Sequence, residues 1–501
     1  MTVAGTRTIT HWIDGRATDP DPDGRRLTLV DPAAGTPAAE VELAAAEVVD
    51  RAVTTAAAAF PAWSARPPAR RAAVLKGFAE ILGRRRAELE ELIVAEQGKT
   101  RADAAGEVAR GLETVELATG APQLLTGRFG AEVSGGVDTY SLRQPLGVCA
   151  AITPFNFPVM IPLYMLSLAL ACGNTVVLKP SEHVPSAAVL LAEALTEAGL
   201  PGGAFSVVHG DAEAVDALLE HPGVAAVSFV GSTPVARHVY QQSAATGKRV
   251  QALGGAKNHA VVLPDAALDA TADALVSAAY GAAGQRCMAV TVAVAVEPIG
   301  DELVGRLAER ASALRIGPGA DPASDLGPLI TARARERVAS LIERGVGVGA
   351  VLVLDGRGAT VDASPDGHWI GPTLFDHVTP ELELYREEIF GPVLVVVRVP
   401  DLDAALALLH ASPVGNGSAV FTDSGAAARR FATEAPTGTV GVNVPIPFPV
   451  SHFGFGGWKA SRLGDHGLNA DAVGFYTREK VITQRWLAPT GVDLGFARSG
   501  R

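Results

Sequence analysis

The sequence is poor in cysteine, in net positive charge and in long uninterrupted apolar segments. Only Cys149, Cys172 and Cys287 occur among 501 residues, which argues against a disulfide framework and favours a reducing compartment. The formal net charge of −12 argues against a nucleic-acid partner, because phosphate binding needs basic patches. No Cys/His cluster has the spacing of zinc ligands, so we expect no metal.

Segments that would direct the chain to or across a membrane are also missing. The N-terminal stretch MTVAGTRTITHWIDG has neither the apolar core of a secretory signal nor an amphipathic transit pattern. The most apolar stretch, residues 159–178, contains Pro162, Gly173 and Asn174 and lies between two strand-like runs, so we interpret it as a buried helix. A cytoplasmic protein without membrane association is expected.

What the chain does contain is a regular alternation of strand-like and helical segments. At 501 residues it is too long for one core, so two or three lobes are expected. Residues 8–30 resemble a hairpin around HWIDG, and residues 44–99, broken near Pro67-Pro68, and 102–118 show helical periodicity. From residue 147 the alternation is typical of a doubly wound parallel sheet, where ligands bind at the carboxyl ends of strands.

Two further segments alternate with a period of two residues. They are residues 128–143, predicted to form an exposed hairpin, and residues 473–486 near the C-terminus. We expect the two segments to join in one small sheet that is able to pair with another subunit.

Two residues attract attention for their chemistry. Cys287, in GAAGQRCMAVTVAVAV, lies before an apolar strand, next to the cation Arg286, which is expected to lower the pKa of its thiol. From the residues alone, a cysteine before such a strand is more often a small buried hydrophobe. Asn156, in PFNFP, likewise has a structural alternative, the capping of a helix that opens at Pro158.

Several short motifs occur in an ordered set: PFNFP, LKPSE, FVGST, LGG, GQRCMA and EEIFGPV. Their order and separations resemble those of the aldehyde dehydrogenase superfamily, and the match runs from HWIDG to Trp486. The resemblance implies an α/β fold with a Rossmann-type NAD-binding lobe, a second α/β catalytic lobe and a small bridging β-sheet. The expected domains are a NAD-binding domain (1–127 and 144–255), a catalytic domain (256–450) and an oligomerisation sheet (128–143 and 470–490).

The resemblance also implies roles for Cys287 and Asn156. The Cys287 thiolate adds to an aldehyde, and the resulting oxyanion accepts hydrogen bonds from the Asn156 amide and the backbone N–H of Cys287. Hydride transfer to NAD then leaves a thioester on Cys287.

A further set of residues matches the cofactor-binding positions of the superfamily. A carboxylate at Glu182 accepts hydrogen bonds from ribose hydroxyls and repels a 2′-phosphate, so NAD is favoured over NADP. Many relatives keep a second glycine where this chain has Ala236, a departure near the pyrophosphate turn. Without the resemblance, KPSE would be only a capped helix start. The positions are Phe155, Lys179, Glu182, Gly231, Ser232, Glu388 and Phe390.

One residue expected in hydrolytic members is absent. These enzymes carry a glutamate just before LGG that activates water, whereas this chain has Ala252 there, or Gln251 if the alignment shifts by one residue. No Asp or Glu lies between Glu220 and Asp265, so no small shift restores the base. Because general-base activation contributes about 10²–10⁴-fold, the acyl-enzyme should hydrolyse slowly and react with another nucleophile.

The segments ALGGAKNHAVVLPDA, VNVPIPFPVSHF and FYTREKVITQRW resemble the coenzyme-A-acylating branch, the methylmalonate-semialdehyde dehydrogenases. In that branch two arginines bind the carboxylate of a short aldehyde, and by motif they fall on Arg110 and Arg286. For Arg110 the alternative is a helix-surface salt bridge with Glu107 or Glu113.

The implied reaction oxidises malonate or methylmalonate semialdehyde with NAD, with loss of carbon dioxide and transfer of an acetyl or propionyl group to coenzyme A. A homodimer or homotetramer is expected. The loop with GGWKAS resembles hydrolytic members equally and leaves the aldehyde's chain length open, and His452 and His466 in it are expected to satisfy local hydrogen bonds. The alternatives are a hydrolytic NAD-dependent aldehyde dehydrogenase acting on another short aldehyde, and a catalytically silent NAD-binding scaffold.

Overall fold

The first lobe is built on an eight-stranded sheet with parallel central strands. The structure, a computed structural model, describes residues 7–464 and 467–486. The strand order β22-β12-β11-β8-β9-β10-β2-β3 shows that the chain winds outward from β8 in both directions, which leaves a crevice at the carboxyl ends of β8 and β11. The strands are β2 (Trp12–Ile13), β3 (Arg16–Ala17), β8 (Val148–Ile152), β9 (Thr175–Lys179), β10 (Phe205–Val207), β11 (Val224–Val230), β12 (Arg249–Leu253) and β22 (Arg462–Leu463).

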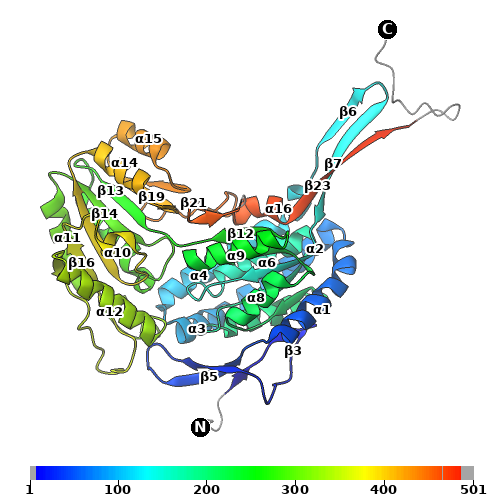
Figure 1. Cartoon of the computed structure of the whole chain (residues 1–501), viewed down its shortest axis with the longest axis horizontal. Coiled ribbons are helices and arrows are strands. Elements are labelled where there is room, and N and C mark those ends of the chain that lie inside the picture. The colour runs from blue at the N-terminus through cyan, green and yellow to red at the C-terminus, as the bar shows by residue number, and fades with distance from the viewer. Residues whose placement is uncertain (1–6, 465–466, 487–501) are drawn as a thin grey trace.

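Helices cover both faces of this sheet (Figure 1). The core on one face is formed with α2, α4, α6 and α7, and the core on the other face with α1, α8 and α9. Every residue of α6 is buried, in keeping with apolar residues on all sides of that helix. The helices are α1 (Ala46–Ser64), α2 (Pro68–Arg84), α3 (Arg86–Gln97), α4 (Arg101–Thr119), α5 (Ala121–Leu124), α6 (Met160–Cys172), α7 (Ser186–Glu197), α8 (Ala212–Glu220) and α9 (Thr233–Ala245).

The second lobe contains a seven-stranded sheet in the order β15-β16-β17-β14-β13-β19-β20. Its strands are parallel to their neighbours except at the edge pair β15 and β16. All residues of β14 are buried, as expected for the interior of a parallel sheet. The strands are β13 (Asn258–Val262), β14 (Val290–Val296), β15 (Val351–Leu354), β16 (Thr373–Asp376), β17 (Val393–Val399), β19 (Gly417–Phe421) and β20 (Thr439–Val442). The helices are α10 (Leu268–Tyr280), α11 (Gly300–Ser312), α12 (Ala332–Gly347), α13 (Glu383–Arg386), α14 (Leu402–Ala411) and α15 (Gly425–Glu434).

A three-stranded sheet projects from the first lobe as an arm (Figure 1). It consists of β6 (Phe129–Ser134), β7 (Val137–Pro145) and β23 (Thr477–Arg485), and β23 pairs antiparallel with β7 along the full length of both strands. The two segments that alternate in the sequence therefore meet in one sheet. The remaining short elements are β1 (Thr8–Ile9), β4 (Arg26–Val30), β5 (Pro37–Glu42), β18 (Val414–Gly415), β21 (Trp458–Lys459) and α16 (Ala472–Phe475), with 3-10 turns at Gly281–Gly284 and Asn469–Asp471.

Most of the expected elements are present, with two differences. The helical break at Pro67-Pro68 is the junction of α1 and α2, but α8, between β10 and β11, was not expected. Residues 8–30 do not form a single hairpin. Only β2 and β3 pair around the turn, where Asp14 and Gly15 have φ values of 57° and 73°, while β1 and β4 join β5 in a separate sheet. Within the described residues, no helix has both the length and the apolar composition needed to cross a bilayer.

Candidate active site

Cys287 lies between the 3-10 turn and the first residue of β14. Its carbonyl oxygen accepts hydrogen bonds from the Nδ2 atoms of Asn258 and Asn416, at 2.8 and 3.1 Å. Asn258 begins β13 and Asn416 precedes β19, so two neighbouring strands of the second lobe fix the main chain of the cysteine. All three cysteines are free, but only Cys287 is partly exposed, because Cys149 lies within β8 and Cys172 within α6.

The environment of the Cys287 thiol differs from the expectation. Burial raises the pKa of Cys287 to about 12, and the Glu388 carboxylate raises it further, against the backbone N–H groups of Cys287 and Met288 and the Lys99 ammonium. The prediction that Arg286 lowers this pKa is wrong. The Arg286 guanidinium is ion-paired with Asp103 and lies next to Gly281. The Asp103 carboxylate compensates the positive charge of Arg286, so this charge does not stabilise the Cys287 thiolate.

Asn156 lies in the segment that follows β8 and is buried. Its Nδ2 donates to the carbonyl of Gln285 over 3.0 Å, which places the amide beside the turn that leads into Cys287. The capping alternative is wrong, because α6 begins at Met160 and its first amides are bound by another residue. The Oε1 atom of Glu107 accepts hydrogen bonds from the backbone N–H groups of Val159 and Met160, at 2.8 and 3.1 Å.

A cleft of about 920 Å³ opens at the carboxyl ends of β8, β9 and β11. Lys179 Nζ and Glu182 Oε2 are 3.2 Å apart at its edge, and the rings of Phe155 and Phe390 meet edge to face with their centroids 5.8 Å apart. A volume of about 920 Å³ is large enough for a dinucleotide. Six of the seven residues assigned to the cofactor line it: Phe155, Lys179, Glu182, Gly231, Ser232 and Phe390.

The turn between β11 and α9 fits a pyrophosphate site. Ser232 precedes the first turn of α9, its side chain makes no capping bond to the amides of that turn, and Ser232 lines the cleft together with Pro234 and Val235. A side chain at Gly231 would collide with the ring of Phe229, since its Cβ would lie 2.5 Å from Cζ. Ala236, at the position where many relatives have glycine, is fully buried in α9, and its methyl group packs in the core.

Glu388, the seventh residue, is not among the residues that line the cleft. Its Oε1 accepts a hydrogen bond from the backbone N–H of Ala256 over 3.0 Å, and burial raises the pKa of its carboxyl group. Two cations hold the loop that carries it. Lys257 Nζ donates to the carbonyls of residues 384 and 387, both at 2.7 Å, and Arg337 donates to those of residues 388 and 389. Burial lowers the pKa of Lys257 to about 7.

The two predicted substrate arginines have different surroundings. Arg110 is half-exposed on α4, and its Nη1 lies 3.0 Å from Glu113 Oε2, so the helix-surface salt bridge is present. Burial raises the pKa of Tyr164, and the Glu113 carboxylate raises it further, whereas the Arg110 guanidinium lowers it. The ring of Tyr164 stacks on Phe448 at 5.9 Å. Arg286 forms an ion pair with Asp103, which lies in the first turn of α4.

The position of the missing base contains no carboxylate. Ala252 is fully buried in β12 and packs with Phe229 and Ala236, whereas Gln251 Nε2 donates to Ser228 Oγ over 2.8 Å. The carboxylate that acts on the Cys287 thiol is Glu388, which the Ala256 amide already engages.

Sequence reasoning did not identify several residues that build the site. Of the two asparagines that bind the Cys287 carbonyl, one follows LGG and the other precedes β19. Three charged residues at or just before the start of α4, with four-residue spacing, contact the segments that carry Asn156 and Cys287. That spacing is the only signal in the sequence that would have drawn attention to the α4 residues. The missed residues are Lys99, Asp103, Glu107, Asn258, Lys257, Arg337 and Asn416.

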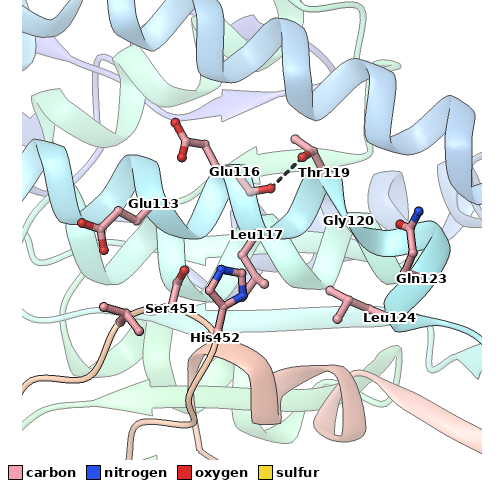
Figure 2. Close-up of a pocket in the computed structure, with 10 residues that line it drawn as sticks. Glu113, Glu116, Leu117, Thr119, Gly120, Gln123, Leu124, Ser451 and His452 are labelled. Carbon is pink, nitrogen blue, oxygen red and sulfur yellow. Dashed lines mark hydrogen bonds between the residues drawn. The ribbon is translucent and has the colours of Figure 1, made fainter.

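A second pocket, of about 680 Å³, lies at the C-terminal end of α4. Figure 2 shows Ser451 and His452 on a loop that faces Glu113 and Leu117 of that helix. His466 lies outside the described residues. Within the described part of the chain, no group of three or more His, Cys, Asp and Glu residues is placed to hold a metal ion.

A two-lobed α/β fold that combines a partly exposed thiol with an adjacent dinucleotide-sized cleft belongs to the class of thiol-dependent dehydrogenases. Residues 19–482 match the aldehyde dehydrogenase family. The chain belongs to this family.

Relatives and solved structures are similar over almost the whole chain. A malonate-semialdehyde dehydrogenase of Pseudomonas aeruginosa is 51% identical over 481 residues, which cover 96% of each chain. Malonate-semialdehyde dehydrogenase 1 of Oceanobacillus iheyensis is 45% identical, over 97% of this chain and 100% of that relative. The structure of a methylmalonate-semialdehyde dehydrogenase from Oceanimonas doudoroffii has a TM-score of 0.95 at 48% identity and covers 96% of this chain and 99% of its own. A protein of Sinorhizobium meliloti 1021 solved with NAD has a TM-score of 0.96 at 47% identity, covering 97% of this chain and 100% of its own.

Proposed function

We propose that the chain oxidises malonate or methylmalonate semialdehyde with NAD through a thioester on Cys287 and transfers the acyl group to coenzyme A. The observation that carries this proposal is the combination of the free, partly exposed Cys287 thiol with Ala252 at the position where hydrolytic members have a glutamate. The names of the relatives support the choice of aldehyde, and the structure solved with NAD supports the choice of cofactor.

The residues at the boundary between the lobes provide the covalent chemistry. Cys287 adds to the aldehyde carbon as its thiolate, formed by loss of the thiol proton to solvent water, and the Asn156 amide with the backbone N–H of Cys287 binds the oxygen that becomes negative. NAD, bound in the cleft, accepts the hydride, so the adduct on sulfur becomes a thioester. We assign Glu182 and Lys179 to the adenosine ribose, and Glu388 and Phe390 to the nicotinamide end.

The substrate carboxylate is assigned to Arg110 and Arg286. Both belong to one side of the Cys287 region, since α4 carries Arg110 and also carries Asp103, which holds the Arg286 guanidinium. A planar guanidinium forms two parallel hydrogen bonds with a carboxylate, so these arginines would select aldehydes with an acid group.

The acyl group leaves the enzyme through a thiol. The thioester carries its carboxylate on the α carbon, β to the thioester carbonyl, so loss of carbon dioxide leaves an electron pair that is stabilised as an enolate at the Asn156 site, and a proton then adds to the α carbon. The thiol of coenzyme A then attacks the carbonyl and the Cys287 thiolate leaves, which gives acetyl-CoA or propionyl-CoA. Hydrolysis competes poorly because no carboxylate at position 252 directs water.

The decisive experiment follows NADH from enzyme, NAD and malonate semialdehyde, with and without coenzyme A. Without coenzyme A we expect a burst of about one NADH per active site; with it, steady turnover and acetyl-CoA by mass analysis. The Cys287→Ala variant should abolish the burst and serves as the control. Steady formation of a free acid without coenzyme A would overturn the acyl-transfer proposal in favour of the hydrolytic alternative.

We also propose the assembly and the domain division. The exposed apolar side chains Phe129, Val133, Leu142, Val481 and Trp486 lie on or beside the arm, a surface suited to a second copy of the chain. The NAD-binding domain is assigned to 1–127 and 144–255, the catalytic domain to 256–450 and the oligomerisation sheet to 128–143 and 470–490; residues 1–6 and 487–490 of these ranges lie outside the described residues. A homodimer or homotetramer in the cytoplasm completes the proposal, and a monomeric mass by light scattering would contradict it.

A further inference from the structure

A buried ion pair lies behind the candidate active site. Lys99 Nζ and Glu107 Oε2 are 2.6 Å apart, and their side chains are 1% and 0% exposed. Lys99 precedes α4, and Glu107 lies in the second turn of that helix. Removing two charges from water is costly, so such a pair is weak evidence for stability and needs another explanation.

The remaining contacts of both side chains go to one segment. Lys99 Nζ donates to the backbone carbonyl of Asn156 and lies 3.9 Å from the centre of the Phe157 ring. Glu107 uses its other oxygen for the amides of Val159 and Met160. The pair therefore holds residues 156–160 from both ends.

These contacts determine where the Asn156 side chain points. The bond from Lys99 reaches the main chain of Asn156 itself, and the Asn156 amide then reaches the Gln285 carbonyl over 3.0 Å. An amide that binds a developing oxyanion is effective only when it is oriented in advance. Burial lowers the pKa of Lys99, and the adjacent Glu107 carboxylate opposes this shift.

The same helix also reaches the segment that carries the nucleophile. Asp103, one turn before Glu107, accepts a hydrogen bond from the backbone N–H of Ala282 over 3.0 Å and pairs with Arg286. Ala282 and Ala283 have φ values of 51° and 53°, a left-handed conformation that non-glycine residues avoid without external support. The start of α4 thus contacts both segments whose relative position determines the reaction.

We propose that Lys99 and Glu107 are positioning residues that orient the Asn156 amide toward the carbonyl oxygen bound at Cys287. The inference depends on the proposed role of Asn156 as an oxyanion donor. Neither residue touches the substrate. Their contribution acts through the main chain of residues 156–160.

The test measures the rate of the NADH burst in single turnover for Glu107→Gln. The glutamine oxygen still accepts from Val159 and Met160, but its amide group replaces the carboxylate oxygen opposite the Lys99 ammonium. We expect the burst rate to fall by about 10-fold to 100-fold, less than the 10²–10³-fold that removal of an oxyanion donor costs. The KM for the aldehyde and the affinity for NAD should stay within about twofold, because the pair contacts neither ligand.

A double-mutant cycle with Asn156→Ala separates positioning from general destabilisation. Where Asn156 has been truncated, Glu107→Gln should slow the burst by less than about twofold, because there is no amide left to orient. Fully additive effects of the two substitutions would overturn the inference. A native burst rate in Asn156→Ala would instead overturn the assigned role of Asn156, and a native rate in Glu107→Gln beside a slow Asn156→Ala would overturn the inference alone.

Asp376→Asn is the matched control, because it removes the carboxylate of another largely buried ion pair. Asp376 Oδ2 lies 2.6 Å from Arg398 Nη2, and Arg398 is in register with Ala295, at the opposite end of β14 from Cys287. This variant should lower the melting temperature and leave the burst rate native. If Glu107→Gln does not fold, the charge-balanced Lys99→Met/Glu107→Gln variant replaces it, with the same expected loss and the same refutation.

Discussion

Replacement of Arg286 by glutamine tests the substrate assignment most directly. The Arg286 guanidinium lies over Gly281, one of its Nη atoms is bound by Asp103, and the adjacent residue is the nucleophile. Asp103 occupies only part of the five-donor fork, so the other donors are free to pair with a carboxylate on the aldehyde.

The expected magnitude follows from the type of bond that is lost. A hydrogen bond to a charged group contributes about 1.5–3 kcal/mol, which corresponds to about 10-fold to 150-fold in kcat/KM. The loss should affect malonate semialdehyde and spare propanal, which has no carboxylate. The ratio of the two kcat/KM values cancels any general damage to the site, including the cost of leaving Asp103 without its cation.

The assay is NADH formation with each aldehyde at saturating NAD and coenzyme A. Arg84→Gln provides the matched control, since Arg84 forms an exposed ion pair with Glu197 on the cofactor lobe and should leave the ratio unchanged. If the ratio for Arg286→Gln stays within about twofold of native, Arg286 does not bind the carboxylate, and its role is the ion pair with Asp103.

Three further predictions concern the thiol, the missing base and the cofactor. Because burial raises the pKa of Cys287 to about 12, the thiolate fraction and the rate of alkylation by iodoacetamide should rise about tenfold per pH unit between pH 7 and 10; a plateau below pH 9 would contradict this. Ala252→Glu should release free acid without coenzyme A, measured as steady NADH formation after the burst, and an unchanged deacylation rate would mean that position 252 does not reach the thioester. Glu182→Ala should weaken NAD more than NADP, seen as a lower ratio of their kcat/KM values, and an unchanged ratio would refute contact with the ribose hydroxyls.

Local patterns in the sequence predicted most of the elements, although α8 and the separate sheet of β1, β4 and β5 were not expected. The strands around the cleft and the break at Pro67-Pro68 follow from local patterns, whereas the assignment of Lys179 and Glu182, which line the cleft, came from the family resemblance. Local patterns are enough there because a strand and the turn that follows it are contiguous in the chain.

Contacts between distant segments could not be predicted in this way. Lys99 and Asn156 are 57 positions apart, and Arg286 meets Asp103 across 183 positions, so no local pattern links them. The pKa of Cys287 was predicted in the wrong direction for the same reason. The adjacent Arg286 is visible in the sequence, whereas the burial of the sulfur and the compensation of that arginine by Asp103 depend on the whole fold.

The hydrogen bonds to the Cys287 carbonyl have a mechanical consequence. Asn258 and Asn416 bind the backbone of Cys287 to the second lobe, whereas Asn156 follows β8 of the first lobe and reaches the cysteine's segment through the Gln285 carbonyl. A small rotation of one half against the other would separate the two groups and switch the chemistry off without breaking a strand or a helix. Reactivity in this protein is therefore a property of how its halves are docked.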